Sequence, residues 1–389
     1  MTRLKIKLII FSYIYGITLL VTEAFCQGID RNEYSGIDND INSVVITGKS
    51  NLKAAEFLEI PASARGMALG NAFSAVGDDV NTIWWNPAGL AYLTRAETSV
   101  SHLNYNHQFG MDYTFAAAGI PIIRNKLTLG AFFGYFDYRD FEITSISQPT
   151  GTGEIAKFFD YQAGGSLSYR ILKNLSLGFS LKRVHLDMGA YYKANALALD
   201  AGALYRYSYS NHQLSLSISV QNYGTDFGSE RVLDNDIDLD TTRVSRYGFY
   251  KTTTYQLPGS VAFGLGYQYQ FAQNYNILAS VEYCKPKEFL NSYQSLKSLG
   301  MEFNWPVAKF LKASIRAGWL TLEGMGRLTS EGAGRLTLEA GRQGENRTES
   351  RLGCGFDFTV AGRSVRLDYA RNIREGIPNQ DFLTLSVGI

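Results

Sequence analysis

Few side chains in this sequence stand at the spacings that catalysis or metal binding requires. The four histidines are His102, His107, His185 and His212. None belongs to a His-Glu-x-x-His pattern, and the sequence contains no Gly-x-Ser-x-Gly elbow and no glycine-rich phosphate loop. The adjacent carboxylates Asp78 and Asp79 could bind a cation, but without further carboxylates nearby a helix cap explains them better. We therefore expect no enzyme, no metal site and no cofactor.

A second set of charged residues lies on the polar face of segments in which apolar and polar residues alternate. They are Lys182, Glu282, Lys312, Arg316, Arg351, Asp357, Arg366 and Asp368. If these segments are strands of a barrel, the charged side chains point into the lumen, where they could form a path for ions. Such groups more often pair with one another or with a plug, because charged side chains inside a lumen need partners that satisfy their charge and hydrogen bonds. We expect the pairing.

The alternation itself predicts strands. Residues 175–182, 214–221 and 261–270 place apolar side chains on one face and small or polar ones on the other, as successive residues of a strand do. The runs extend over about ten residues, the length that a tilted strand needs to cross a bilayer. Two packed sheets of a soluble protein also alternate. The strand length, a secretion signal and the glycine- and serine-rich polar face together favour an all-β, antiparallel outer-membrane β-barrel.

About fourteen strands are expected, an even number, as in barrels made from one bacterial chain. The predicted ranges are 97–107, 110–122, 126–144, 154–170, 174–187, 193–209, 212–223, 255–271, 275–286, 295–305, 309–322, 348–360, 363–372 and 381–389. The 25 Tyr and 23 Phe residues suit the aromatic girdles of such a barrel. The 37 basic residues nearly balance the 36 acidic ones, so the charge does not suggest nucleic acid as a partner. The expected surroundings are outer-membrane lipid.

The first residues have the three parts of a signal peptide. Basic residues precede an apolar run over residues 8–21, and small residues allow cleavage near Cys26. The apolar run is shorter than the roughly 20 residues that a membrane-spanning helix requires. We expect a signal peptide over residues 1–26, a flexible lead-in over residues 27–53, and a mature protein in a Gram-negative-type outer membrane.

Residues 54–93 differ from the rest of the chain because they are rich in Ala and Gly and lack the period of two. A barrel of about 14 strands has a lumen wide enough to leak. We therefore expect this segment to form a hatch inside a barrel of residues 97–389. Its candidate site residues are Trp84, Trp85, Asn86, Pro87 and Gly89. The proline fixes a turn and the glycine permits close backbone approach. The two tryptophans could wedge the hatch against the wall or simply pack a periplasmic helix.

Two long connections, 226–251 and 324–347, are expected outside the cell, because periplasmic turns are short. The second contains the repeat Gly-Arg-Leu-Thr, which could prolong the flanking strands as a hairpin above the membrane or form a flexible loop. Arg327 and Arg335 of this repeat are candidate contacts for acidic partner proteins.

The hatch segment carries a family resemblance. Ala55–Leu58, Ala64–Phe73, Asp78-Asp79 and Trp84–Ala91 resemble the N-terminal signature of the PorV/PorQ family. That family is similar to the FadL-type fatty-acid transporters, which are 14-stranded barrels with an N-terminal hatch that carries an Asn-Pro-Ala motif. One departure is the final residue, Ile389, where barrels commonly end on an aromatic residue.

The resemblance implies two alternative functions. PorV/PorQ members serve type IX secretion, which implies an accessory that binds secretion-system and cargo proteins through its external loops. The alternative is a FadL-like transporter of long-chain fatty acids or other hydrophobic small molecules. A transporter needs an apolar cavity of about 300–1,000 Å³, whereas an accessory can keep its lumen sealed. Phe132 and Phe136 have inward parity and could line such a cavity or pack the hatch.

Overall fold

The computed structural model describes residues 54–107, 109–144, 147–189, 193–227, 255–272, 275–287, 295–323, 328–331, 335–338, 347–374 and 379–389. The signal peptide and the lead-in predicted for residues 1–53 lie outside this range, as does most of the predicted external loop 226–251.

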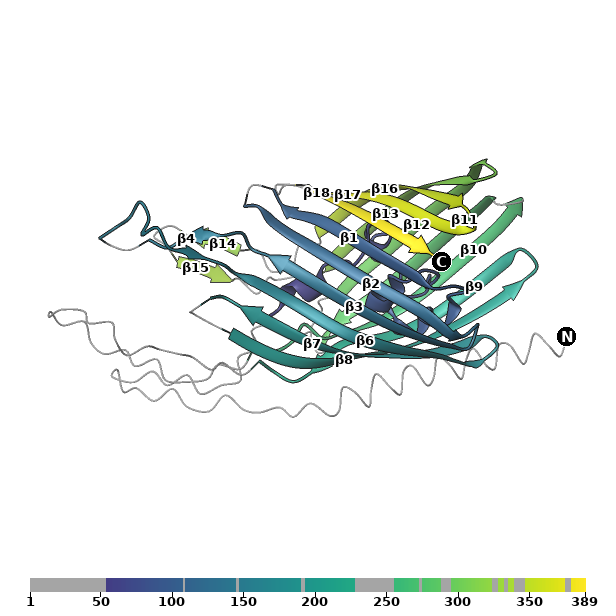
Figure 1. The fold of residues 1–389 in the computed structure, drawn as a ribbon, viewed down its shortest axis with the longest axis horizontal. Helices are drawn as coiled ribbons and strands as arrows, with labels where there is room; N and C mark the ends of the chain where they lie inside the picture. Colours follow the sequence, from purple (N-terminus) through teal and green to yellow (C-terminus); the bar gives the residue numbers. More distant parts are fainter. Residues whose placement is uncertain are drawn as a thin grey trace.

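Within the described residues, the long alternating segments form fourteen antiparallel strands that close into a barrel (Figure 1). The wall consists of β1 (Glu97–Asn106), β2 (Met111–Ile123), β3 (Leu127–Asp137), β6 (Phe159–Leu172), β7 (Leu175–Asp187), β8 (Lys193–Tyr209), β9 (His212–Gly224), β10 (Ser260–Ala272), β11 (Tyr275–Pro286), β12 (Ser295–Ala308), β13 (Leu311–Glu323), β16 (Arg347–Val360), β17 (Arg363–Ile373) and β18 (Gln380–Gly388). Since β1 pairs with β18, the sheet has no free edge. The predicted fold class is confirmed.

Three predicted strands differ in extent from those observed. The ranges 126–144 and 154–170 each extend beyond the wall into a small external hairpin, β4 (Phe141–Glu142) and β5 (Ile155–Ala156). The range 255–271 begins too early, because β10 starts at Ser260. Pro258 explains that difference, since proline cannot donate to the ladder of a wall strand.

The outer face of the barrel is apolar and the inner face is small or polar. In the middle of β7, Leu181 is 59% exposed while its neighbour Ser180 is buried. Large apolar side chains such as Leu197 and Ile315 are also more than half exposed on the outside. Soluble proteins rarely expose so continuous an apolar surface, so this is a transmembrane barrel of outer-membrane type. Among the described residues, no helix is long and apolar enough to span a membrane.

The two ends of the barrel differ. Glu97 of β1 pairs with Gly388 of β18, so the wall begins and ends at the same rim. The connections at that rim, such as 173–174, 210–211 and 361–362, are short, and those at the other rim are mostly long. The first rim is therefore periplasmic and the second external. At the external side, β14 (Leu328–Glu331) pairs with β15 (Arg335–Leu338) as a separate hairpin that does not prolong β13 and β16.

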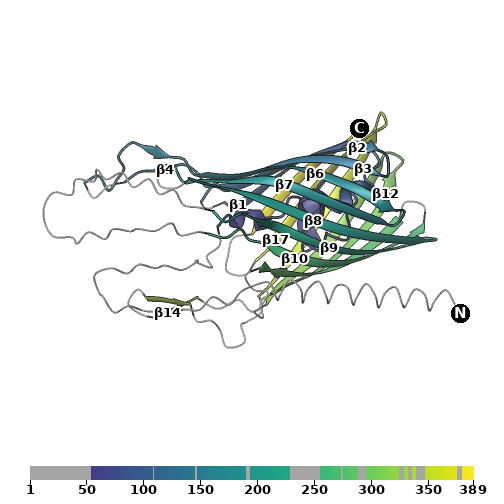
Figure 2. The same ribbon diagram turned by 90° about the horizontal axis from the view of Figure 1, so that it is seen from below.

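Residues 54–93, here called the hatch, lie inside the lumen, where Figure 2 shows their purple helices behind the wall strands. They form η1 (Glu56–Glu59), α2 (Ala64–Ala68), α3 (Thr82–Trp85) and η2 (Pro87–Tyr92). The backbone N–H of Ala54 donates to the carbonyl oxygen of Gln256 near the external rim, and the hatch continues into Glu97 at the periplasmic rim. The chain therefore passes through the lumen from the outside inwards.

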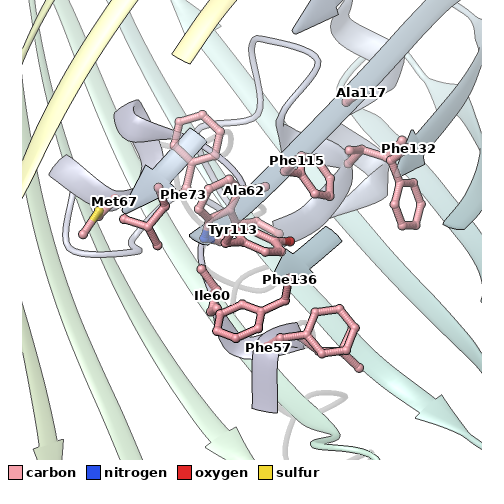
Figure 3. Packing of buried hydrophobic residues seen from close by; sticks show 14 of the residues in the cluster. Phe57, Ile60, Ala62, Met67, Phe73, Tyr113, Phe115, Ala117, Phe132 and Phe136 are labelled. Carbon is pink, nitrogen blue, oxygen red and sulfur yellow. The ribbon is translucent and has the colours of Figure 1, made fainter. Parts of the chain in front are cut away.

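An apolar cluster joins the hatch to one side of the wall. Phe57 and Ile60 of the hatch lie against Tyr113 of β2 and Phe136 of β3 (Figure 3). The ring centroids of Phe136 and Tyr105 are 5.3 Å apart, in an edge-to-face arrangement. This cluster fills the external half of the lumen beside β1, β2 and β3.

Candidate functional site

The turn at Asn86 anchors the hatch to the wall. The Asn86 side chain is fully buried. Its Oδ1 accepts a hydrogen bond from the backbone N–H of Ala88 at 3.0 Å and so caps η2, in which Pro87 occupies the first turn. Its Nδ2 donates to the carbonyl oxygens of Ser74 and Ala203, each at 3.2 Å. One side chain therefore holds two parts of the hatch and strand β8 together.

Glycines in the wall make room for this turn. A Cβ atom on Gly178 of β7 would lie 2.2 Å from the backbone nitrogen of Ala88, and one on Gly202 of β8 would lie 2.1 Å from Oδ1 of Asn86. Within the hatch, a Cβ on Gly89 would lie 2.3 Å from Oγ1 of Thr82. These distances are far below van der Waals contact, so the turn can reach the wall only where side chains are absent.

The two tryptophans occupy different surroundings. Trp85 is 2% exposed and packs against Phe73, with ring centroids 4.9 Å apart, and against Trp84 at 4.7 Å. Gly66 lies under the Trp85 ring, where a Cβ would be 2.2 Å from the ring. Trp84 is half-buried. Gln221 of β9 donates through Nε2 to the carbonyl oxygens of both tryptophans, which ties this part of the hatch to the wall.

A bulge in β9 places Gln221. The register between β8 and β9 shifts between Leu199 and Ala201, and Asn222 adopts a left-handed backbone conformation with φ of 56°. The carboxylate of Asp200 accepts a hydrogen bond from the backbone N–H of Asn222 at 2.7 Å and pairs with Lys182 at 2.7 Å. The bulge is thus held by a buried ion pair next to the hatch.

A cavity of about 180 Å³ lies in the external half of the lumen, on the outer side of the two tryptophans. Its walls come from the hatch and from the upper parts of β9 to β13, and most of its surface is apolar. Apolar lining residues include Leu58, Trp84, Pro258, Leu296, Leu320 and Leu322. Among the polar lining residues, Glu282 accepts a hydrogen bond from the backbone N–H of Ser74 at 2.9 Å.

A charged cluster closes the opposite, periplasmic half. Arg65 of α2 is buried and pairs with Asp78 at 2.5 Å, with Asp79 at 2.9 Å and with Glu302 of β12 at 2.8 Å. Although burial acts to raise it, the pKa of Asp78 lies below its ordinary value, because the Arg65 guanidinium stabilises the carboxylate. Beside this cluster lies a polar cavity of about 340 Å³, lined partly by Arg65 and Lys312.

The prediction that Asp78 and Asp79 mainly cap a helix is wrong. Both carboxylates pair with Arg65, and α3 begins only at Thr82, although Asp79 also accepts the backbone N–H of Asn81 at 3.0 Å. Their common partner, Arg65, lies in an earlier helix of the same segment.

Most inward charges predicted from the sequence form pairs, as expected. Arg316 contacts Glu302 at 2.6 Å and Asp368 at 2.7 Å. Arg366 reaches Asp79 of the hatch at 3.3 Å and Asp357 at 3.6 Å. Arg351 pairs with Glu349 at 3.0 Å. Among the described residues, Glu282 and Lys312 of this set have no ion-pair partner; Glu282 lines the external cavity and Lys312 the periplasmic one.

The remaining predicted residues lie elsewhere. Phe132 and Phe136 are buried in the cluster that packs the hatch, and neither lines one of the two cavities above. Arg327 lies outside the described residues, and Arg335 is the first residue of β15. Within the described residues, no group of three or more His, Cys, Asp or Glu side chains could hold a metal ion.

Sequence reasoning missed Glu302, Gly178, Gly202 and Gln221 as parts of the site. Glu302 has the inward parity of its strand, so it belonged with the other lumenal charges. The two glycines stand on the polar face of their strands, but nothing local distinguishes them from other small lumenal residues. Gln221 acquires its role only through the bulge at Asn222.

Comparison of the sequence with family models and with curated proteins finds no match. The fold is similar to solved outer-membrane barrels. A Pseudomonas aeruginosa FadL homologue is 14% identical, with a TM-score of 0.47, and 84% of this chain covers 98% of that chain. The Pseudomonas putida toluene transporter TodX is 11% identical, with a TM-score of 0.48 and coverage of 87% and 98%. The CymD monoaromatic hydrocarbon channel is 9% identical, with a TM-score of 0.49 and coverage of 84% and 96%. These are weak similarities of chain arrangement.

Proposed function

We propose that this protein is an outer-membrane channel for small hydrophobic molecules. The observation that carries the proposal is the largely apolar cavity on the outer side of Trp84 and Trp85. Its position suits a molecule that enters from the external side and reaches the hatch before anything else. This is the second of the two functions that the sequence suggests.

The size of the cavity favours small ligands. Its volume of about 180 Å³ resembles the roughly 150 Å³ of an engineered apolar cavity that holds benzene. It falls below the range of about 300–1,000 Å³ for drug-sized ligands, and a long-chain fatty acid is larger than a single ring. Single-ring molecules therefore fit this cavity better than long-chain fatty acids do.

The channel is closed at the hatch. The external cavity and the periplasmic cavity share no lining residue. Between them lie α2, α3 and the Asn86 turn, bonded to the wall on several sides. A ligand in the external cavity therefore reaches the periplasm only if part of the hatch moves or the wall opens.

Uptake of a labelled single-ring hydrocarbon tests the proposal. Toluene entry would be measured in cells that lack their own hydrophobic channels and that express this protein. Leu320 lines the cavity and is buried, so Leu320→Trp should fill the cavity and reduce uptake. Leu352 faces lipid, 52% exposed, so Leu352→Trp is the matched control and should leave uptake unchanged. No uptake by a correctly inserted protein, or equal uptake by both variants, would reject the proposal.

A role as an accessory of type IX secretion finds no favouring observation in the described residues. The loops proposed to bind partners lie largely outside them. Deletion of the gene separates the two functions, because an accessory predicts secreted cargo trapped in the periplasm, whereas a channel predicts an unchanged surface proteome.

A further inference from the structure

The external cavity has an unusual charge for an apolar chamber. Its lining includes three carboxylates, Glu59, Glu282 and Glu323, and no Lys, Arg or His among the described residues. Glu323 is compensated by Lys297 at 2.6 Å and by the Ser295 hydroxyl at 2.8 Å. Glu282 accepts the backbone N–H of Ser74 and forms no ion pair with a described residue. The chamber therefore offers a ligand a hydrogen-bond acceptor at Glu282, and its described lining holds no cation.

Two residues that line the cavity also contain a polar atom that is fully buried. Trp85 is 2% exposed, and its indole Nε1 is buried with no hydrogen-bond partner among the described residues. The amide Oδ1 of Asn71 is likewise buried and without a described partner. Neither atom is accessible from the cavity, so the ligand class is decided by Glu282 and not by these two atoms.

The tryptophan side of the cavity also suits a positive charge. Trp84 is half-buried and lines the cavity together with Trp85. The face of an indole ring attracts ammonium groups, and more strongly where water is excluded. A carboxylate in the same place would find no cation among the described lining residues and would lose its hydration without gaining an ion pair.

We propose that the external cavity selects single-ring apolar molecules that carry a hydrogen-bond donor, that it prefers an amine, and that it excludes carboxylates. Glu282 is the group that recognises the donor, and the leucines and tryptophans enclose the ring. This inference rests on the proposed function and specifies its ligand class. It also excludes free fatty acids as ligands of this cavity.

Binding to the purified full-length protein in detergent tests the inference directly. Three probes of equal ring size, benzylamine, benzyl alcohol and benzoate, would be titrated while the fluorescence of the protein's four tryptophans is followed. We expect saturable binding of benzylamine, weaker binding of benzyl alcohol, and no saturable binding of benzoate. Glu282→Gln should weaken benzylamine binding about tenfold, since it removes a hydrogen bond to a charged group. Glu282→Asp should restore part of the affinity.

Glu154→Gln is the matched control, because Glu154 is exposed beside the external hairpin and should not affect binding. Equal affinity for benzoate and benzylamine, or an unchanged affinity in a folded Glu282→Gln variant, overturns the inference. If that variant does not fold, the comparison of the three probes on the unaltered protein decides alone.

The inference and the proposed function can fail separately. Uptake of toluene without discrimination between benzylamine and benzoate leaves the channel and rejects the selectivity. Glutamate-dependent binding of benzylamine without uptake of any probe keeps the site and rejects the channel.

Discussion

At the scale of single residues, the position of the hatch depends on glycines of the wall, which have no side chain to obstruct it. Gly202 lies opposite the Asn86 amide, and a Cβ there would stand 2.1 Å from Oδ1. Gly178 gives the same clearance to the backbone of Ala88. Because both neighbours are parts of a bonded turn rather than ends of flexible side chains, neither can move without breaking hydrogen bonds.

Gly202→Ala is therefore expected to displace the Asn86 turn. The free energy of unfolding should fall by about 1–3 kcal/mol, as for overpacking elsewhere, and cells should become more sensitive to large antibiotics that the closed barrel excludes. Urea titration followed by heat-modifiable gel migration measures the first effect. Gly165→Ala is the control, because Gly165 has no neighbour closer than 3.8 Å to such a Cβ. Equal stability of the two variants would contradict the role of Gly202.

Arg65 is the other residue on which the hatch depends, since it joins α2 to Asp78, Asp79 and Glu302. Arg65→Ala leaves buried carboxylates without their partner, which we expect to destabilise the folded barrel by about 3–5 kcal/mol. Arg65→Lys should recover only part of the lost stability, because lysine keeps the positive charge but cannot form the same forked hydrogen bonds. Both effects can be measured by urea titration.

The matched control for Arg65 is Arg124→Ala. Arg124 is an exposed residue of a periplasmic turn and should have little effect on stability. A similar loss of stability in the two alanine variants would exclude a special contribution from the buried cluster.

At the scale of elements, the bulge of β9 connects wall and hatch. It lets Gln221 reach the carbonyl oxygens of Trp84 and Trp85, while Asp200 binds the backbone of Asn222. The φ angle of 56° at Asn222 is in the region that Asn and Gly tolerate and β-branched residues do not.

Asn222→Gly should therefore retain the bulge, whereas Asn222→Val should lose about 1–3 kcal/mol of stability from strain. The valine variant should also change the fluorescence of the tryptophans, because Gln221 moves with the bulge. Denaturation midpoints and emission spectra of the two variants give the comparison. A valine variant as stable as the glycine variant would mean that the bulge tolerates a different backbone conformation.

At the scale of the whole molecule, the apolar outer belt defines how the barrel lies in the membrane. Leu181 is the middle residue of β7 and is 59% exposed, whereas Tyr209 ends β8 at the periplasmic rim and is 70% exposed. If the belt is embedded as inferred, Leu181→Arg should destabilise the barrel by about 2–4 kcal/mol and Tyr209→Arg by about 0–1 kcal/mol. Unfolding from lipid bilayers measures both, and equal losses would place the membrane differently.

The sequence by itself determined the wall. Strand alternation is a local property, because each residue's side depends only on its neighbours, so thirteen or fewer residues are enough to recognise β7 or β9. The same reasoning placed the inward charges, and the lack of alternation over residues 54–93 set apart the segment that contains Trp84–Gly89. It could not predict which inward groups meet, since several arrangements of the hatch would satisfy the same parity.

Only the tertiary structure decided those contacts. Arg65 and Glu302 are 237 residues apart, and they pair because the hatch passes through a closed barrel whose far wall carries Glu302. Phe132 and Phe136 could have lined a cavity, but they are buried in the cluster that the hatch forms with β2 and β3. The cavity lies instead over Trp84, against β9 to β13. The physical reason is that side-chain direction follows from the backbone of one strand, whereas the space in front of that side chain depends on every segment that closes around it.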